Sequence, residues 1–307
     1  MNTTTTTTTV GQAVKAITRI IVHPGIFHAD DVFACAWLRH LGCDAPVDRR
    51  VPTPEELEDP AVLVADIGGR HEPALMNFDH HQRGGAGERW DTSVPFAAFG
   101  LVYQALSGYG QSPVADRFDE TLVQPIDALD NGFGAGASDS TPRCSLSAAV
   151  SSFNPGPSTT AAERDAAFEE AVKWVRPLIQ NFEAEAVRFV AARDEVLAAP
   201  VEDAVLVLGA FVPWGEHVFA RPDQAGILFA VFPSERGGWM VQQVPAEAGS
   251  FAGRLPLPEA WAGLRGAELQ EECGVPDAVF VHPGRFCGGA DTLEGVKEMA
   301  LRAIATT

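Results

Sequence analysis

Three apolar runs of this chain each end directly before an acidic or imidazole side chain. They read Ile-Thr-Arg-Ile-Ile-Val-His over residues 17–23, Ala-Val-Leu-Val-Ala-Asp over 61–66 and Leu-Met-Asn-Phe-Asp-His over 75–80. Short apolar runs bounded in this way are typical of buried β-strands. If these strands are parallel, their carboxyl ends meet at one edge of a sheet, and the polar residues that follow them gather there.

Segments with a helical pattern separate the runs. Residues 31–41 follow the first run and residues 94–106 follow the third, and Gly42 and Gly108 close these two segments. Strands that alternate with helices predict an α/β domain with a doubly wound, mostly parallel sheet. Ligands of such sheets bind beyond the carboxyl ends of the strands.

A long, alanine-rich and charged segment, residues 160–199, predicts a helix that links two halves of the chain. The strand pattern then restarts, which indicates a second, smaller α/β domain. Its expected strands are 204–208, 226–232, 239–244 and 278–281, and its last helix is 293–304. We place the catalytic domain at 17–195 and the second domain at 196–307, after a disordered, threonine-rich tail at 1–16.

The charge balance limits the partners of this protein. Its 307 residues include 41 acidic and 22 basic side chains, for a formal net charge of −19. Such a surface repels a phosphate backbone, so long duplex nucleic acid is not an expected partner. A short RNA or oligonucleotide, or a small phosphate ester, is compatible if divalent cations supply the positive charge. The oligomeric state stays open, a homodimer included.

The cysteines and the hydropathy favour a cytoplasmic location. Five cysteines without CxxC spacing (Cys35, Cys43, Cys144, Cys273 and Cys287) favour reduced thiols in a cytoplasmic protein. No run of about 18 apolar residues is present, so a membrane span is not expected. The threonine-rich start also lacks the apolar segment of a secretory signal.

The polar residues predicted at the sheet edge form a set of metal ligands, with His28 and Asp30 close behind His23 in the chain. Carboxylates combined with imidazoles suit Mn²⁺, Mg²⁺ or Zn²⁺. Two ions about 3.5 to 4 Å apart can generate a hydroxide and offset charge on a reacting phosphate. Asp66 is our candidate for the bridging carboxylate, because it ends a strand and Gly68-Gly69 leave room for an ion.

These motifs resemble those of the DHH phosphoesterase superfamily. Within it, the chain is similar to the Myg exonuclease family, once described as metal-dependent protein hydrolases. The similar strings are HPGIFHAD at 23–30, DHHQR at 79–83, IDALDNG at 126–132, VQQVP at 241–245, GSF at 249–251, RLPLP at 254–258 and FVHPG at 280–284, followed by Gly288-Gly289. The resemblance extends from about Ile20 to the C-terminus.

The resemblance implies roles for the residues of the first domain. It makes His80 a metal ligand and His81 a contact to the substrate phosphate, while Asp79 orients a histidine. Asp130 resembles the last ligand of the set, and Asp127, one helical turn earlier, is the alternative.

The resemblance also implies that the second domain binds substrate. His282, Arg285, Gly288 and Gly289 match a motif whose backbone amides could meet phosphate oxygens. Arg254 is a further candidate for substrate binding. In the first domain, Arg83 is a candidate charge clamp beside the metal ions.

The chain departs from the superfamily pattern at two places. A histidine, three residues and two alternating aspartates are usual, whereas four residues and a second histidine occur here, so either His23 or His28 could be the direct ligand. Residues 147–155 carry no arginine, although the family commonly has one in this stretch. The second departure bears on how substrate is bound and not on the metal site.

Together these features predict a divalent-metal-dependent phosphoesterase, specifically a 3′–5′ exonuclease that acts on RNA or short oligonucleotides. A hydroxide generated on two Mn²⁺ or Mg²⁺ ions would attack phosphorus in line. The alternatives are a small-molecule phosphohydrolase for pyrophosphate or a nucleotide, and a metal-binding regulatory protein without turnover. The native substrate and the physiological metal stay open.

Overall fold

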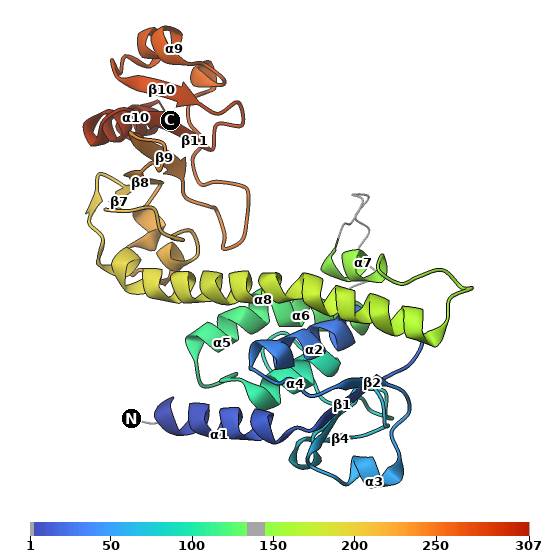
Figure 1. The fold of residues 1–307 in the computed structure, drawn as a ribbon. Coiled ribbons are helices and arrows are strands. Elements are labelled where there is room, and N and C mark those ends of the chain that lie inside the picture. Colours follow the sequence, from blue (N-terminus) through green and yellow to red (C-terminus); the bar gives the residue numbers. More distant parts are fainter. Residues whose placement is uncertain (1–2, 134–144, 307) are drawn as a thin grey trace. The chain divides into compact units, whose positions relative to one another are not determined.

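The computed structural model describes residues 3–133 and 145–306, with the backbone alone for residues 3–9. The chain divides into two compact units, residues 1–187 and 188–307 (Figure 1). The division falls inside the long helix α8, Ala161–Ala198, which has almost the bounds expected for the linking helix. It lies a little before the boundary that the sequence suggests.

The first unit is built on a five-stranded sheet with the order β2-β1-β3-β5-β4. Its strands are β1 Arg19–Val22, β2 Val47–Arg49, β3 Val62–Ala65, β4 His71–Glu72 and β5 Asn77–Phe78. Neighbouring strands from β2 to β5 are parallel, and only β4 is antiparallel to its neighbour. The α/β class and the mostly parallel sheet are therefore confirmed.

The helices of this unit pack mainly on one face of the sheet. They are α1 Thr3–Ala16, α2 Ala29–His40, α3 Pro54–Leu57, α4 Ala98–Leu106, α5 Pro113–Phe118, α6 Gln124–Asp130 and α7 Leu146–Ser151, together with a π-helical turn at Asp119–Val123. Ile20 and Val22 of β1 face the large core below α2 and α4. Ile21 points to the opposite face, where a small cluster with Val62 and Val64 lies under α3. This alternation follows from the period of two in a strand.

The N-terminal segment differs from the expected disordered tail, because residues 3–16 form helix α1. Residues 10–17 supply the reason. Val14 and Ile17 are buried in the core of the first unit, and Val10 and Ala13 pack against that core. Apolar spacing of three to four residues thus anchors a helix that a reading of the threonine run alone does not suggest.

The second unit contains a six-stranded, mostly antiparallel sheet with the order β10-β11-β9-β8-β7-β6. Its strands are β6 Val201–Glu202, β7 Val205–Val207, β8 Phe229–Pro233, β9 Trp239–Gln243, β10 Ala278–Val281 and β11 Cys287–Ala290. The helices α9, Gly266–Cys273, and α10, Leu293–Ala305, complete its core. The four strands expected here are present, and β11, which contains Gly288 and Gly289, is a strand that the sequence pattern did not indicate.

No helix in the part of the chain that the structure describes is both long and apolar enough to span a membrane. Cys35, Cys43, Cys273 and Cys287 are free and buried. Cys144 lies outside the described residues.

Candidate metal centre

The ends of three parallel strands bring the predicted ligands together. His23 follows β1, Asp66 follows β3, and the Asp79-His80-His81 triplet follows β5. β1 and β3 are adjacent, while the chain leaves β1 toward β2 on the other side. The site therefore lies at a topological switch point, where open α/β sheets bind their ligands.

Asp66 occupies the middle of the cluster. One carboxylate oxygen, Oδ2, lies 3.3 Å from Nε2 of His23, and the other, Oδ1, lies 3.3 Å from Nε2 of His80 and 3.4 Å from Nδ1 of His81. The two oxygens thus face imidazoles on two sides, as a carboxylate between two ions would. Asp66 also has a positive φ of 59°, a strained conformation for a residue other than glycine.

The N-terminus of α2 adds two buried carboxylates. Asp30 and Asp31 are fully buried in its first turn, where the helix dipole favours negative charge. Asp31 Oδ2 lies 3.1 Å from His23 Nε2, and Asp30 Oδ2 lies 3.9 Å from His80 Nε2. The site prediction omitted Asp31, although it follows Asp30 directly in the chain. Its position in the first turn of a helix could have identified it as a further candidate ligand.

The fourth carboxylate comes from the end of α6. Asp130 Oδ2 lies 3.3 Å from Nε2 of His80, and its Oδ1 lies 4.0 Å from Nδ1 of His28. Asn131, which the prediction also omitted, places its side-chain oxygen 3.4 Å from Nδ1 of His80 and so fixes the other side of that ring. The side chain of His28 is open to solvent and is 55% exposed.

Asp127, the alternative to Asp130, has a different partner. It is fully buried and accepts hydrogen bonds from Arg89 at 2.9 Å and from the backbone of Gly100 at 3.0 Å. Arg89 also makes a bidentate pair with Asp119. A side chain at position 100 would collide with Asp127, its Cβ lying 1.9 Å from Oδ2, so glycine is required there. Asp127 thus supports α6 from within the core.

The pKa values of Asp30, Asp31 and Asp130 are raised because several carboxylates lie buried close together. Burial, and then the negative charges of Asp66 and Asp130, raise the pKa of Asp30 well above its usual value. Burial also raises the pKa values of Asp31 and Asp130. Burial opposes a charged imidazole at His23, but the neighbouring carboxylates outweigh it and raise the pKa of His23 to about 9.

Several polar atoms at the centre lack hydrogen-bond partners among the described residues. They include both carboxylate oxygens of Asp30, Oδ1 of Asp66 and Nε2 of His80. Buried polar groups in this state are costly unless another group satisfies them. Three groups of residues offer ligand atoms within 4.8 Å of one another; they are His23-His28-Asp66, Asp66-His80-His81 and His28-Asp30-Asp130. Divalent cations fit this donor set, and Asp66 is shared by two of the groups.

Asp79 organises the DHH triplet. Its Oδ1 accepts from the backbone amides of His80 and His81 and lies 2.8 Å from Nδ1 of His81, and its Oδ2 accepts from Gly69. Burial opposes its ionised form, but these hydrogen bonds outweigh burial and lower its pKa. The predicted orienting contact between Asp79 and a histidine is therefore present. His81 itself is 61% exposed and can reach a ligand.

Two side chains hold the loop that carries His23 and His28. Asn154 binds both the backbone amide and the carbonyl of Phe27, at 3.0 and 2.8 Å. Arg49 donates to the carbonyl of Gly25 at 2.7 Å and lies over the Phe27 ring. Neither residue was identified from the sequence, because their partners are backbone groups far away in the chain.

A pocket of about 270 Å³ adjoins the metal cluster. Its lining residues are His28, Ala29, Leu129, Asp130, Ser147 and Ser151. Ser147 and Ser151 lie in residues 147–155, a stretch that carries no arginine in this chain. The lining at this side therefore includes two serine side chains and no guanidinium.

The remaining candidates have unequal settings. Arg83 is exposed and makes no ion pair with any described residue. His282 is exposed at the end of β10, where its Nδ1 accepts from the amide of Gly284. Arg254 instead donates to the carbonyl oxygens of Pro245 and Ile227 and to the Gln224 side chain, so it ties a loop of the second unit together.

The glycine pair has a packing role. Gly288 and Gly289 lie within β11, which pairs with β10 on one side and β9 on the other. A Cβ at Gly288 would lie 2.9 Å from the carbonyl oxygen of Phe280. The sheet geometry therefore argues against the predicted contact between these two amides and phosphate.

Comparisons with known proteins place the chain in a family. The model of the MYG1 exonuclease family, described as an uncharacterised protein family (UPF0160), matches residues 19–304. The chain is 32% identical to the MYG1 exonuclease of Homo sapiens, across 94% of this chain and 86% of that protein. It is 33% identical to the MYG1 exonuclease of Mus musculus, across 94% and 85%, and 29% identical to a MYG1 protein of Schizosaccharomyces pombe, across 94% and 98%.

Among solved structures, the chain is similar to RecJ of Thermus thermophilus in complex with Mn²⁺. The identity is 16%, the alignment covers 98% of this chain and 54% of that one, and the TM-score is 0.29, too low to bear on function. The family model and the long matches above 30% identity are decisive. The chain belongs to the MYG1 exonuclease family and is a hydrolytic enzyme of the nuclease and phosphoesterase class.

Proposed function

We propose that this protein is a 3′–5′ exonuclease that removes nucleotides from RNA or short oligonucleotides with two divalent ions, Mn²⁺ or Mg²⁺. The observation that carries the proposal is the position of Asp66, whose two oxygens face imidazoles on two sides. Family membership supports the nuclease activity. When bound, the two ions would activate water and offset the charge that develops on phosphate.

The residues of the chain divide into two groups of metal ligands that share Asp66. His23 with Asp31 would hold one ion. Asp30, His80 and Asp130 would hold the other. The exposed His28 lies between the groups and would serve either ion. Because the strand ends and the helix N-terminus are fixed by the fold, these ligands are preorganised.

His81 and its partner Asp79 would act on the substrate. The hydrogen bond to Asp79 fixes the ring of His81 at Nδ1, so the second nitrogen is available to a phosphate oxygen. Arg83, two residues further and exposed, would add a positive charge near the same phosphate. In the second unit, the exposed His282 is the substrate-binding candidate that the local geometry supports best.

The pocket beside the cluster favours short substrates. A volume of about 270 Å³ suits one nucleotide residue rather than a strand, and its hydroxyl groups neutralise no charge. The net charge of −19 also favours short substrates, because an acidic surface repels a long phosphate backbone. These two observations also support a second candidate function, hydrolysis of a small phosphate ester or phosphoanhydride such as pyrophosphate or a nucleotide. The four free, buried cysteines of the described residues favour a cytoplasmic location for either activity.

Asp66→Asn tests the metal centre, since it keeps the size of the side chain but removes the charge that two ions would share. We expect the variant to lose bound Mn²⁺, measured by elemental analysis, and to lose hydrolysis of a single-stranded RNA labelled at its 5′ end. The matched control is Asp194→Asn, at a side chain 92% exposed. Full Mn²⁺ occupancy in Asp66→Asn would contradict the bridging role.

The same assay separates the proposed substrates. A 3′–5′ exonuclease shortens 5′-labelled RNA in single-nucleotide steps. Release of the 5′ label as a mononucleotide at the start would reverse the direction. Hydrolysis of pyrophosphate alone would favour the second candidate function.

A further inference from the structure

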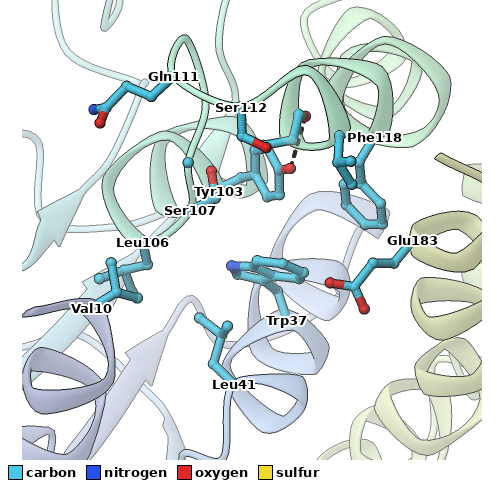
Figure 2. A pocket seen from close by; sticks show the side chains of 13 residues that line it. Val10, Trp37, Leu41, Tyr103, Leu106, Ser107, Gln111, Ser112, Phe118 and Glu183 are labelled. Atoms are coloured by element: carbon cyan, nitrogen blue, oxygen red, sulfur yellow. Dashed lines mark hydrogen bonds between the residues drawn. The ribbon is translucent and has the colours of Figure 1, made fainter. Parts of the chain in front are cut away.

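A second cavity lies in the first unit, apart from the metal centre. It has a volume of about 540 Å³, in the usual range for small-molecule sites. Its lining residues include Trp37 of α2, Tyr103 and Leu106 of α4, Val114 and Phe118 of α5 and Glu183 of α8 (Figure 2). Trp37 is seven residues from Asp30 along α2, about 10 Å of helix, so the cavity does not overlap the metal ligands.

The walls are aromatic and fixed. Trp37, Tyr103 and Phe118 are buried and contact one another, with ring centroids 5.0 to 5.5 Å apart. The Tyr103 hydroxyl donates to the carbonyl of Ala115 at 2.9 Å and is thus already engaged. The cavity therefore offers a rigid, mostly apolar surface.

One polar atom in this wall has no partner. Trp37 is 5% exposed, and its Nε1 makes no hydrogen bond with any described residue. Figure 2 shows this nitrogen on the edge of the ring that faces Leu106 and Val10, which both line the cavity. Buried indole N–H groups usually find an acceptor. An acceptor on a molecule in the cavity would satisfy Trp37.

The charge of the lining selects against anions. Glu183 is the one charged residue among those that line the cavity in the described chain, and it pairs with His40 at 3.0 Å. A carboxylate at the rim, on a protein with a net charge of −19, disfavours fatty acids and phosphorylated compounds.

We propose that this cavity binds a neutral, mainly apolar cyclic molecule that carries a hydrogen-bond acceptor, such as a ketone or a heteroaromatic nitrogen, and that the acceptor takes the Trp37 N–H. The aromatic walls bind the apolar body, and Nε1 gives the orientation. The site is separate from the nuclease reaction and does not depend on metal.

Three probes of one shape test the proposal on the full-length protein by ligand-observed NMR titration. They are 2-acetylnaphthalene, which has an acceptor, 2-methylnaphthalene, which has none, and 2-naphthoate, which is negatively charged. We expect the ketone to bind best and the anion at least about tenfold more weakly. Absence of binding by the ketone at its solubility limit, or stronger binding of the anion, would overturn the proposal.

Variants locate the probe. Trp37→Phe keeps an aromatic wall and should weaken the ketone about fivefold or more, with a change below about twofold for the hydrocarbon. Val114→Trp, at a half-buried position of the lining, should abolish binding of both. Trp90→Phe, at a side chain 90% exposed, is the matched control and should change nothing. Equal ketone affinity in wild type and Val114→Trp would place the probe elsewhere and refute the site, even if Trp37→Phe fails to fold.

Discussion

Arg89→Met should destabilise the first unit strongly and in a pH-dependent way. Arg89 is 1% exposed and its guanidinium joins the buried carboxylates of Asp119 and Asp127 at 2.6 to 2.9 Å. Methionine fills similar space but leaves both carboxylates without their cation. Breaking a buried pair by removing one partner costs about 3 to 5 kcal/mol. We expect a loss in this range at pH 8.

The sign of the pH dependence follows from the pKa values. Burial raises the pKa of Asp127 from the ordinary value of 3.8 to about 7, although Arg89 opposes the shift. Burial also raises the pKa of Asp119, again against Arg89. In the folded wild type, Asp127 holds its proton more tightly than in the unfolded chain. Its contribution to the free energy of unfolding is therefore fully present below about pH 4 and is lost as pH rises to about 7.

Removal of Arg89 should raise both pKa values further, because the charge that opposed protonation is gone. Proton uptake then relieves the buried charges of the variant, and this uptake is more favourable at pH 5 than at pH 8, so the loss should be smaller at pH 5. Urea unfolding followed by circular dichroism at the two pH values measures it. Arg193→Met, which removes an exposed surface pair, is the control and should cost less than about 0.5 kcal/mol. An equal loss at both pH values would refute the argument that carboxylate charge causes it.

Further predictions concern the metal centre and its substrate. His80→Ala should lose Mn²⁺ in elemental analysis. His81→Ala should keep the metal and lose at least about tenfold in kcat/KM, which corresponds to about 1.4 kcal/mol of transition-state stabilisation; the reverse pattern would exchange their roles. Asn154→Ala removes both hydrogen bonds to Phe27 and should weaken Mn²⁺ binding several-fold without loss of the fold. Metal titration and a melting curve measure the two effects, and an unchanged Mn²⁺ affinity would show that Asn154 does not position the loop for metal binding. Oligonucleotides of about two to five residues should be cleaved as efficiently as a long RNA, and the efficiency should depend only weakly on salt concentration. An efficiency that rises with substrate length and falls steeply with salt would instead indicate an extended basic binding surface.

The sequence predicted the part of the fold that depends on local pattern. Each apolar run that ends before His23, Asp66 or Asp79 proved to be a parallel strand, because burial on both faces of such a sheet requires nearly continuous apolar residues. β11 was missed for the opposite reason. Its Cys-Gly-Gly-Ala sequence has no strand pattern, and the strand exists because two neighbours approach closely where side chains are absent. That contact is tertiary and leaves no local signal.

The candidate site shows the same division. Strand ends predicted that His23, Asp66 and His80 would meet, since parallel strands share an edge. The resemblance favoured Asp130 as a ligand and left Asp127, one helical turn earlier, as the alternative. Asp127 is paired with Arg89, which lies 38 positions earlier in the chain and is buried beside it. A partner this distant is visible only in the folded protein.

The strained backbone at Asp66 and the concentration of carboxylates around it both cost stability. A positive φ costs a non-glycine residue of order 1 to 3 kcal/mol, and the surrounding structure must compensate for it. Four carboxylates within one cluster add mutual repulsion and desolvation, which the raised pKa values of Asp30, Asp31 and Asp130 record. Selection for stability alone would remove both costs with a glycine at position 66 and one fewer acid. We propose that both persist because divalent cations, bound by the folded chain and not by the unfolded chain, would add stability of RT ln(1 + [L]/Kd), which can offset several kcal/mol. On this proposal, the strained backbone at Asp66 and the excess of carboxylates around it both serve metal binding.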